Sequence, residues 1–203
     1  MQTMIVPGEK LLVKKALDGD DASFKTIVLQ NQRLVFGIAA KIIHNEDDRK
    51  EIAQEVFIKV YKNLSKFNFD SRLSTWIGRI TYTTTINYLK RKKDPLIADI
   101  FHNEMAQEDD LEAMDYLLPM AENMDAASIF EKKNLKAVIK GELARLPPIL
   151  KTIVFLYHQE ELSYEEIAET THLPMGTVKS YLHRGRSLLK ENLLKKFKKE
   201  DLL

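Results

Sequence analysis

Residues 163–190 read SYEEIAETTHLPMGTVKSYLHRGRSLLK, and this stretch predicts two helices that are separated by a tight turn. Ser163 and Glu166 have the spacing of a capping box, in which each side chain satisfies a backbone amide at the start of a helix. The pattern breaks at 171–173, and Pro174 then stands where the first turn of a second helix is expected. A short capped helix, a turn and a longer helix together predict a helix-turn-helix.

The second predicted helix, Met175–Leu194, has one apolar side and one side of small and basic residues. Val178, Leu182 and Leu188 lie on the apolar side. The opposite stripe consists of Gly176, Lys179, Ser180, His183, Arg184 and Ser187. Such a helix fits the major groove of DNA, where lysine and arginine contact guanine edges or phosphates. Any surface helix can be basic, but the cap, the turn and the stripe in combination favour DNA binding.

The net charge of +1 over 203 residues hides a strong asymmetry along the chain. Residues 1–93 carry a net charge of +7, residues 94–131 carry −11 with no lysine or arginine, and residues 132–203 carry +5. Two basic segments on either side of an acidic one predict two domains and a tether. The absence of cysteine excludes disulfides and thiolate metal sites, and no apolar run approaches the ~20 residues that a membrane span needs.

Helical periodicity dominates outside the acidic segment, and no stretch shows the sustained alternation of a strand. In addition to the two helices above, we expect helices over Glu9–Asp18, Ala22–Ile43, Asp48–Leu64, Thr75–Lys93, Leu135–Leu146 and Ile149–His158. The expected fold is all-α, with two small helical domains joined by a flexible acidic linker, and the second domain contains the helix-turn-helix. The predicted boundaries are 1–93, 94–133 and 134–203.

The predicted helix 48–64 buries one stripe and leaves an opposite polar face. Ile52, Val56 and Val60 recur every four residues on the buried stripe. The opposite face carries Glu51, Gln54, Glu55, Ile58 and Lys62. Ile58 is the apolar member of this face, and two interpretations stay open: an isoleucine exposed without consequence, or part of a docking face for a partner.

Residues 66–74, KFNFDSRLS, break the helical pattern and predict a loop that carries two phenylalanines. In the helix that follows, Trp76, Ile77 and Ile80 form the apolar side. The other side carries Thr75, Arg79, Tyr82, Thr83, Ile86 and Lys90. This helix ends in the basic run 90–93, directly before Asp94-Pro95.

Both halves of the chain resemble one family, the extracytoplasmic-function (ECF) sigma factors. The second half is similar to region 4 of that family through Leu146-Pro147, Ser163, Glu166-Ile167-Ala168 and Gly176-Thr177-Val178-Lys179-Ser180. The first half is similar to region 2 through Gln54, Phe57, Phe67, Trp76-Ile77 and Arg79-Ile80, in that order. The resemblance covers about Phe24–Lys93 and Lys136–Leu193. Two unrelated motifs in the family order are far more specific than either motif alone.

The resemblance implies a sigma factor that binds core RNA polymerase, recognises −35 DNA and melts −10 DNA. Polymerase contacts map to Glu51, Gln54, Glu55, Ile58 and Lys62. Contacts with −10 DNA map to Lys66, Phe67, Asn68, Phe69, Arg72, Arg79, Tyr82, Thr83, Ile86, Asn87 and Lys90. Contacts with −35 DNA map to Lys151, Thr177, Lys179, Ser180, His183, Arg184 and Arg186. Phe67, Phe69 and Trp76 have an alternative role as core residues.

The implied partners are core RNA polymerase, double-stranded promoter DNA and the melted non-template strand. Members of the family are commonly held inactive by an anti-sigma factor, which is expected here too. The expected location is the cytoplasm, with no direct membrane insertion, no cofactor, no metal and no enzymatic activity. A further hypothesis is that the acidic linker masks the basic faces until polymerase separates the two domains, so that deletion of Asp99–Asp125 raises DNA binding.

This chain departs from the family pattern in two places. Thr83 and Asn87 stand where members usually have Asn and Asp, so its −10 contacts are expected to differ. Thr171-His172 replaces the usual Leu-Gly pair of the turn. Histidine adopts a left-handed backbone more readily than most residues, although less readily than glycine. We therefore expect a slightly loosened turn with the fold retained.

The alternative function is a helix-turn-helix regulator that binds operator DNA without being a sigma subunit. It would need a sensing or dimerising N-terminal domain in place of the region 2 pattern. Enzyme classes have weaker support: the run from Asp18 hints at a calcium loop, but its twelfth position is Leu29, where such loops place glutamate. No phosphate-binding loop or nucleophile elbow is present in the sequence.

Overall fold

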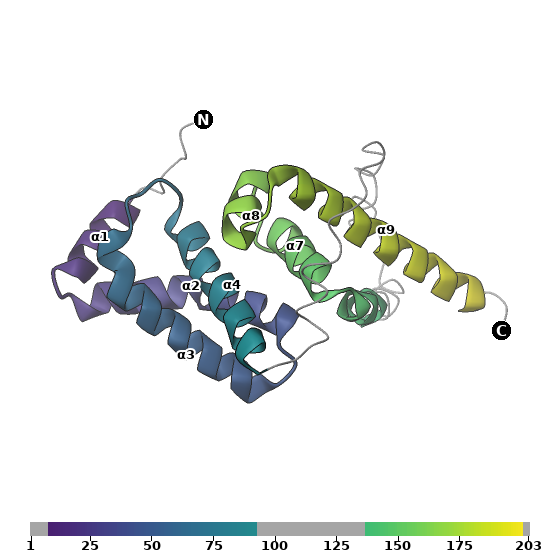
Figure 1. The fold of residues 1–203 in the computed structure, drawn as a ribbon, viewed down its shortest axis with the longest axis horizontal. Helices are drawn as coiled ribbons and strands as arrows, with labels where there is room; N and C mark the ends of the chain where they lie inside the picture. Colours follow the sequence, from purple (N-terminus) through teal and green to yellow (C-terminus); the bar gives the residue numbers. More distant parts are fainter. Residues whose placement is uncertain (1–7, 93–136, 201–203) are drawn as a thin grey trace, which may run out of the picture.

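The computed structural model describes residues 8–92 and 137–200, with side chains as far as 196. The predicted linker 94–133 lies outside these residues. Within the described ranges every regular element is a helix, and no strand occurs (Figure 1). The prediction of an all-α fold with two helical domains is confirmed. Below, the first unit means residues 8–92 and the second unit means residues 137–200.

Four α-helices and a short 3-10 turn form the first unit. They are α1 (Glu9–Leu17), α2 (Asp21–Ile42), α3 (Glu46–Asn63), η1 (Leu64–Lys66) and α4 (Leu73–Arg91). Helices α2, α3 and α4 pack against one another, and α1 packs on α2. Their shared core is fully buried at Ile27, Ile38, Ile52 and Ile77.

Helix α3 begins at Glu46, two residues before the expected bound of the helix 48–64. Asn45 caps it, and the run 45–48 has the sequence features of a helix start. The Asn45 side chain accepts hydrogen bonds from the amides of Asp47, at 2.8 Å, and Asp48, at 3.1 Å. Three acidic residues in the first turn favour the same end, because the N-terminus of a helix carries partial positive charge.

Helix α4 also begins early, at Leu73, inside the predicted loop 66–74. The amide of Leu73 donates to Oε1 of Glu9 at 3.1 Å, so a carboxylate from α1 satisfies an amide at the start of α4. Burial raises the pKa of Glu9, while this hydrogen bond and Arg72 act in the opposite direction. Sequence periodicity carries no information about such a contact between distant segments.

The second unit consists of helical residues 137–145, α7 (Pro148–His158), α8 (Tyr164–Thr171) and α9 (Met175–Glu200). The predicted capping box is present: Ser163 accepts from the Glu166 amide, and Glu166 accepts from the Ser163 amide. His172 has a φ of 58° and ends α8 in the left-handed conformation. The buried Thr171 hydroxyl donates to the Ile167 carbonyl at 2.7 Å, so the turn closes without a leucine at 171. The helix-turn-helix is therefore confirmed as α8, the turn and α9.

The two units pack directly against each other (Figure 1). Helix α7 lies against α2, and α8 lies against α4. Buried apolar residues of both units form one continuous cluster. Among the described residues, no helix is both long and apolar enough to cross a bilayer.

Candidate nucleic-acid interface

The second helix of the helix-turn-helix, α9, presents the predicted basic stripe at the surface. Arg184, Ser180 and Gly176 are exposed, and Thr177, Lys179 and His183 are half-buried. The Ser180 hydroxyl donates to the Gly176 carbonyl at 3.0 Å, so its hydrogen-bond partner is the preceding turn of the same helix. The stripe is thus available along α9, as the sequence predicts.

Two tyrosines from neighbouring helices support cations of α9. The rings of Tyr157 and Tyr164 are stacked, with centroids 5.3 Å apart and an interplanar angle of 18°. Lys179 Nζ lies 5.7 Å from the Tyr164 centroid, and the Arg186 guanidinium carbon lies 4.9 Å from the Tyr157 centroid. The geometry is that of cation–π contacts, which restrain long basic side chains. Sequence reasoning missed both tyrosines, because residues on different helices share no periodicity.

Arg186 has a second partner on α7. Its Nε donates to Nε2 of His158 at 3.2 Å, and His158 is packed edge-on against Tyr157. Burial lowers the pKa of His158, and the Arg186 cation lowers it further. Arg186 therefore joins α9 to α7 in addition to any contact with phosphate.

Lys151 is separate from the α9 stripe. Its Nζ donates to the Ala144 carbonyl at 2.8 Å, which ties α7 to helical residues 137–145. Burial lowers the pKa of Lys151, and Lys41 of α2 adds to this effect. This predicted phosphate contact therefore lies on the side of α7 that faces the first unit.

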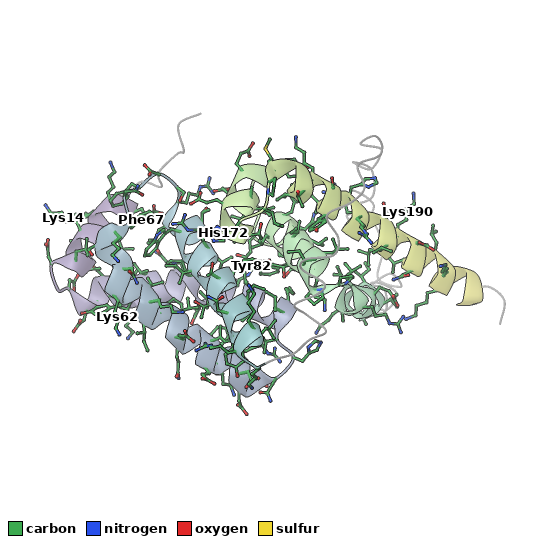
Figure 2. The ribbon with its side chains drawn as sticks, viewed as in Figure 1. Lys14, Lys62, Phe67, Tyr82, His172 and Lys190 are labelled. Carbon is green, nitrogen blue, oxygen red and sulfur yellow. The ribbon has the colours of Figure 1, made fainter. Side chains whose placement is uncertain are left out.

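The predicted docking face of α3 is exposed over most of its length. Ile58 is 54% exposed, and Glu51, Gln54 and Lys62 are also exposed. Figure 2 shows Lys62 on the side of α3 away from the second unit. Tyr61 is 61% exposed and lies three residues after Ile58, so the two side chains are neighbours on the helix surface. Tyr61 was not assigned to this face from the sequence.

Glu55 is the member of this face whose carboxylate forms ion pairs within the chain. Its carboxylate lies 2.7 Å from Lys59 Nζ and 3.2 Å from Nη2 of Arg91 at the end of α4. Hydrogen bonds from Lys59 and then Arg91 lower the pKa of Glu55. Asp48 and Lys92 form a second ion pair, with Nζ of Lys92 2.8 Å from the carboxylate. The pairs Glu55–Arg91 and Asp48–Lys92 therefore join α3 to the end of α4.

The predicted −10 loop is organised around Phe67, which lies in the core at 5% exposure. Its ring centroid is 4.6 Å from that of Phe69 and 5.4 Å from that of Trp76. Trp76 is buried, as the alternative core role predicts. Phe69 is half-buried with a φ of 65°, an uncommon conformation for a residue other than glycine. Lys66 and Asn68 are exposed, and the Asn68 amide donates to the Asp70 carboxylate.

On α4, part of the predicted outer side is exposed and part is covered. Thr83, Asn87 and Lys90 are exposed, and Arg79 and Ile86 are half-buried. Arg72, directly before the helix, is also half-buried. The expectation that Thr75 and Tyr82 face outward is wrong: Thr75 is 0% and Tyr82 is 7% exposed. Helix α8 lies over this side of α4, which explains their burial. Burial raises the pKa of Tyr82, with Tyr181 of α9 adding to the effect.

Polar groups of α8 meet this covered side of α4. Arg72 Nε lies 3.5 Å from Oε1 of Glu166, and Arg79 Nη1 lies 3.8 Å from Oε1 of Glu169. Thr83 Oγ1 lies 3.3 Å from Nε2 of His172. Figure 2 shows Tyr82 and His172 at the junction between the two units. In this arrangement the carboxylates of Glu166 and Glu169 are the partners of Arg72 and Arg79, the arginines that are predicted to contact DNA phosphates.

Fold and surface together define a two-unit helical protein with a helix-turn-helix in its second unit. Family comparison agrees: residues 27–94 match sigma-70 region 2 and residues 137–189 match sigma-70 region 4. The chain is 31% identical to the RNA polymerase sigma-H factor of Pseudomonas aeruginosa, over 91% of this chain and 93% of that protein. It is 30% identical to the ECF RNA polymerase sigma factor SigW of Bacillus subtilis, over 91% and 96%.

Solved structures share the fold at lower identity. CnrH, solved in complex with the cytosolic domain of CnrY, is 17% identical with a TM-score of 0.59, over 92% of this chain and 97% of CnrH. The sigma factor RpoE of Bartonella quintana, solved with the anti-sigma factor NepR, is 18% identical with a TM-score of 0.54, over 84% and 96%.

The chain belongs to the sigma-70 family, in its ECF group. It is a sigma factor, a protein that directs promoter-specific initiation of transcription. An operator-binding regulator outside this family is not favoured, because both sigma regions match in order.

Proposed function

We propose that this sigma factor docks on core RNA polymerase through the exposed face of α3. The observation that carries the proposal is the exposed pair Ile58 and Tyr61, next to one another on a helix within the region 2 match. An apolar pair in a polar surround is typical of the centre of a docking site. Glu51, Gln54 and Lys62 supply the polar rim.

We further propose that the two DNA elements are recognised by different units. The loop around Phe69 and the side of α4 with Arg79, Thr83 and Asn87 engage −10 DNA, where aromatic rings accept unstacked bases and cations hold the backbone. Lys179 and Arg184 of α9 engage −35 DNA in the major groove. Because the two units are tethered, neither needs high affinity by itself.

The structural neighbours also support a partner proposal. CnrH was solved with CnrY, and RpoE of Bartonella quintana was solved with an anti-sigma factor. We propose that an anti-sigma factor binds this chain as well. The chain acts in this proposal as a non-catalytic recognition subunit in the cytoplasm, where its polymerase and DNA partners are found.

Core binding and initiation test the proposal directly. Purified core polymerase is mixed with the wild-type chain and a promoter library, and both association and promoter-dependent transcripts are measured. The variant Ile58→Glu places a charge in the apolar centre of the α3 face, so we expect it to weaken core binding by about tenfold or more. Leu29→Glu is the matched control, because Leu29 on α2 is 53% exposed against 54% for Ile58.

Two results would sink the proposal. One is a wild-type chain that neither associates with core polymerase nor supports promoter-dependent initiation. The other is an equal loss of core binding in Leu29→Glu and Ile58→Glu, since that points to a nonspecific effect of surface charge. Direct binding of free duplex DNA by Ile58→Glu should stay at the wild-type level.

A further inference from the structure

Helix α1 lies beside the loop that is proposed to accept −10 bases, although it stands outside the region 2 match. The match begins at residue 27, whereas α1 spans Glu9–Leu17. Below, the −10 loop means residues 67–72, between η1 and α4. Helix α1 packs on η1, and Figure 1 shows it next to the chain that leads into α4. Two adjacent side chains of α1, Glu9 and Lys10, contact the −10 loop and the residue that follows it.

Glu9 holds the end of the −10 loop, where α4 begins. Its Oε1 accepts a hydrogen bond from the amide of Leu73 at 3.1 Å. Arg72 occupies the capping position of α4, but its side chain makes no capping hydrogen bond. The acceptor at this helix start therefore comes from α1, and Glu9 is half-buried. Removal of the carboxylate takes away the acceptor that fixes the exit of the loop.

Lys10 covers the aromatic ring at the centre of the −10 loop. Its Nζ lies 5.6 Å from the ring centroid of Phe69, which is the geometry of a cation–π contact. The ring of Phe67, in the core, lies 4.6 Å from that of Phe69, centroid to centroid. Phe69 thus contacts both the core and Lys10. Because Lys10 is exposed, its charge stays available to a partner from solution.

The backbone of Phe69 indicates that this presentation of the ring is built in. Its φ of 65° is costly for a bulky residue, and such a conformation persists only where the surroundings hold it. The holding contacts are the rings and Lys10, together with the hydrogen bond from the Asn68 amide to the Asp70 carboxylate on either side of Phe69. The chain therefore keeps a half-buried aromatic ring next to an exposed cation.

A nucleotide matches this pair of groups. Aromatic rings stack with unpaired bases of any sequence, and lysine binds phosphate as a point charge. Because one sugar joins a base to its phosphate, a cation beside the ring can reach the phosphate when the base stacks on the ring. The ammonium group then exchanges a weak contact with Phe69 for an ion pair with phosphate. Lys66, exposed at the end of η1, is a second cation next to the loop.

We propose that α1 completes the −10 site. Lys10 binds the phosphate of the nucleotide whose base stacks on Phe69, and Glu9 is a positioning residue that fixes the loop through the Leu73 amide. The inference rests on the proposed role of the loop in −10 recognition. It adds to that site two residues that lie outside the region 2 match.

Binding of single-stranded −10 DNA by the holoenzyme tests Lys10. The holoenzyme is assembled from core polymerase and the full-length chain, and the probe is a fluorescent oligonucleotide with the non-template −10 sequence of a promoter selected from the library. We expect Lys10→Gln to lower the affinity about three- to tenfold, and the slope of log affinity against log salt by about 0.7, because one phosphate contact is lost.

Lys15→Gln is the matched control for Lys10→Gln. Lys15 is exposed on the same helix, and the substitution removes the same charge. It lies five residues later and so on another side of α1. The effect of Lys10→Gln should also shrink in a Phe69→Leu background, since the two side chains are proposed to hold one nucleotide.

The single tryptophan of the chain reports on Glu9. Trp76 lies in the first turn of α4, and its ring centroid is 5.4 Å from that of Phe67. Glu9→Ala removes the acceptor of the Leu73 amide, whereas Glu9→Gln keeps a carbonyl oxygen. We expect only Glu9→Ala to shift the emission of the free full-length chain to longer wavelength and to weaken probe binding by the holoenzyme several-fold. Core association and binding of a −35 duplex should stay at the wild-type level in both variants.

Several outcomes would overturn the inference. Equal losses in Lys10→Gln and Lys15→Gln, or an unchanged salt slope in Lys10→Gln, remove the phosphate contact. Unchanged emission and probe affinity in Glu9→Ala, or a Glu9→Gln variant as weak as Glu9→Ala, remove positioning through the Leu73 amide. A Phe69→Leu chain that binds the probe as tightly as the wild type instead contradicts the proposed −10 role of the loop, so the two failures are distinguishable.

Discussion

Tyr164 stacks on Tyr157 with ring centroids 5.3 Å apart, and each ring carries a cation from α9. One tyrosine begins α8 and the other lies near the end of α7, so the pair links three helices of the second unit. The stack therefore restrains Lys179 and Arg186 before DNA arrives. Preformed side-chain positions favour binding because less rotamer freedom is lost.

Removal of the Tyr164 ring should weaken −35 recognition. A cation–π contact at an exposed site contributes about 0.5–1 kcal/mol, so Tyr164→Ala is expected to lower affinity for a −35 duplex by about two- to fivefold. Tyr164→Phe keeps the ring and should bind as the wild type does. The measurement is anisotropy with a duplex selected from the promoter library. A phenylalanine variant as weak as the alanine variant would assign the effect to the hydroxyl.

Lys179→Ala together with Arg184→Ala should damage −35 binding while core binding survives. If both cations contact phosphate, the slope of log affinity against log salt falls by about 2. If either side chain contacts a base, discrimination among −35 sequences also falls. Lys195→Ala is the control, since Lys195 lies further along α9 and pairs with Glu191 at 2.6 Å. An unchanged slope and unchanged discrimination would remove both residues from the DNA interface.

The contact between His158 and Arg186 predicts a pH dependence of stability. Burial and then the Arg186 cation lower the pKa of His158, so the folded state favours the neutral imidazole. Its contribution to the free energy of unfolding is fully present above the ordinary histidine pKa of ~6.5, and it is lost as the pH falls below that value and through the lower pKa of the folded state. The wild type should therefore lose more melting temperature between pH 7.5 and pH 5.5 than His158→Gln. Parallel losses in both proteins would contradict this prediction.

The capping box predicts a local loss of stability. Ser163→Ala leaves the Glu166 amide without its side-chain acceptor, which costs about 1 kcal/mol of unfolding free energy. Urea denaturation followed by circular dichroism measures this as a lower midpoint with an unchanged slope. Ser65→Ala, at an exposed position in η1, should leave the midpoint unchanged. A midpoint for Ser163→Ala within error of the wild type would show that the cap does not stabilise the fold.

Local features of this chain follow well from its sequence. The capping box at Ser163, the start of α3 at Asn45 and the left-handed His172 all depend on neighbours within four residues. The exposure of Ile58 also follows, because helical periodicity assigns it to the side opposite Val56 and Val60. Backbone geometry and local hydrogen bonding are sufficient for each of these features.

The burial of α4 shows where such reasoning fails. Thr81 and Thr85 are fully buried, although threonine is a polar residue. Their hydroxyls donate back to the carbonyls of Ile77 and Thr81, each at 2.8 Å, so the helix itself satisfies them. A helix with small, internally satisfied polar residues can be covered on more than one side. Helical periodicity assigns Thr75 and Tyr82 to the outer side of α4, but both side chains are buried because a second surface covers that side.

The sequence by itself determined the helices, the helix-turn-helix and the family, because these depend on local spacing and on two motifs in order. Only the tertiary structure decided that α8 covers α4 and that Phe155 lies on Gly37. Gly78 of α4 lies against Thr170 of α8, where a Cβ built on the glycine would be 3.3 Å from Cγ2 of the threonine. The two residues are far apart in the chain, and nothing in the neighbourhood of either one specifies the other. Their approach depends on the absence of a side chain at glycine and on the pairing of Arg72 and Arg79 with glutamates, which are properties of two surfaces together.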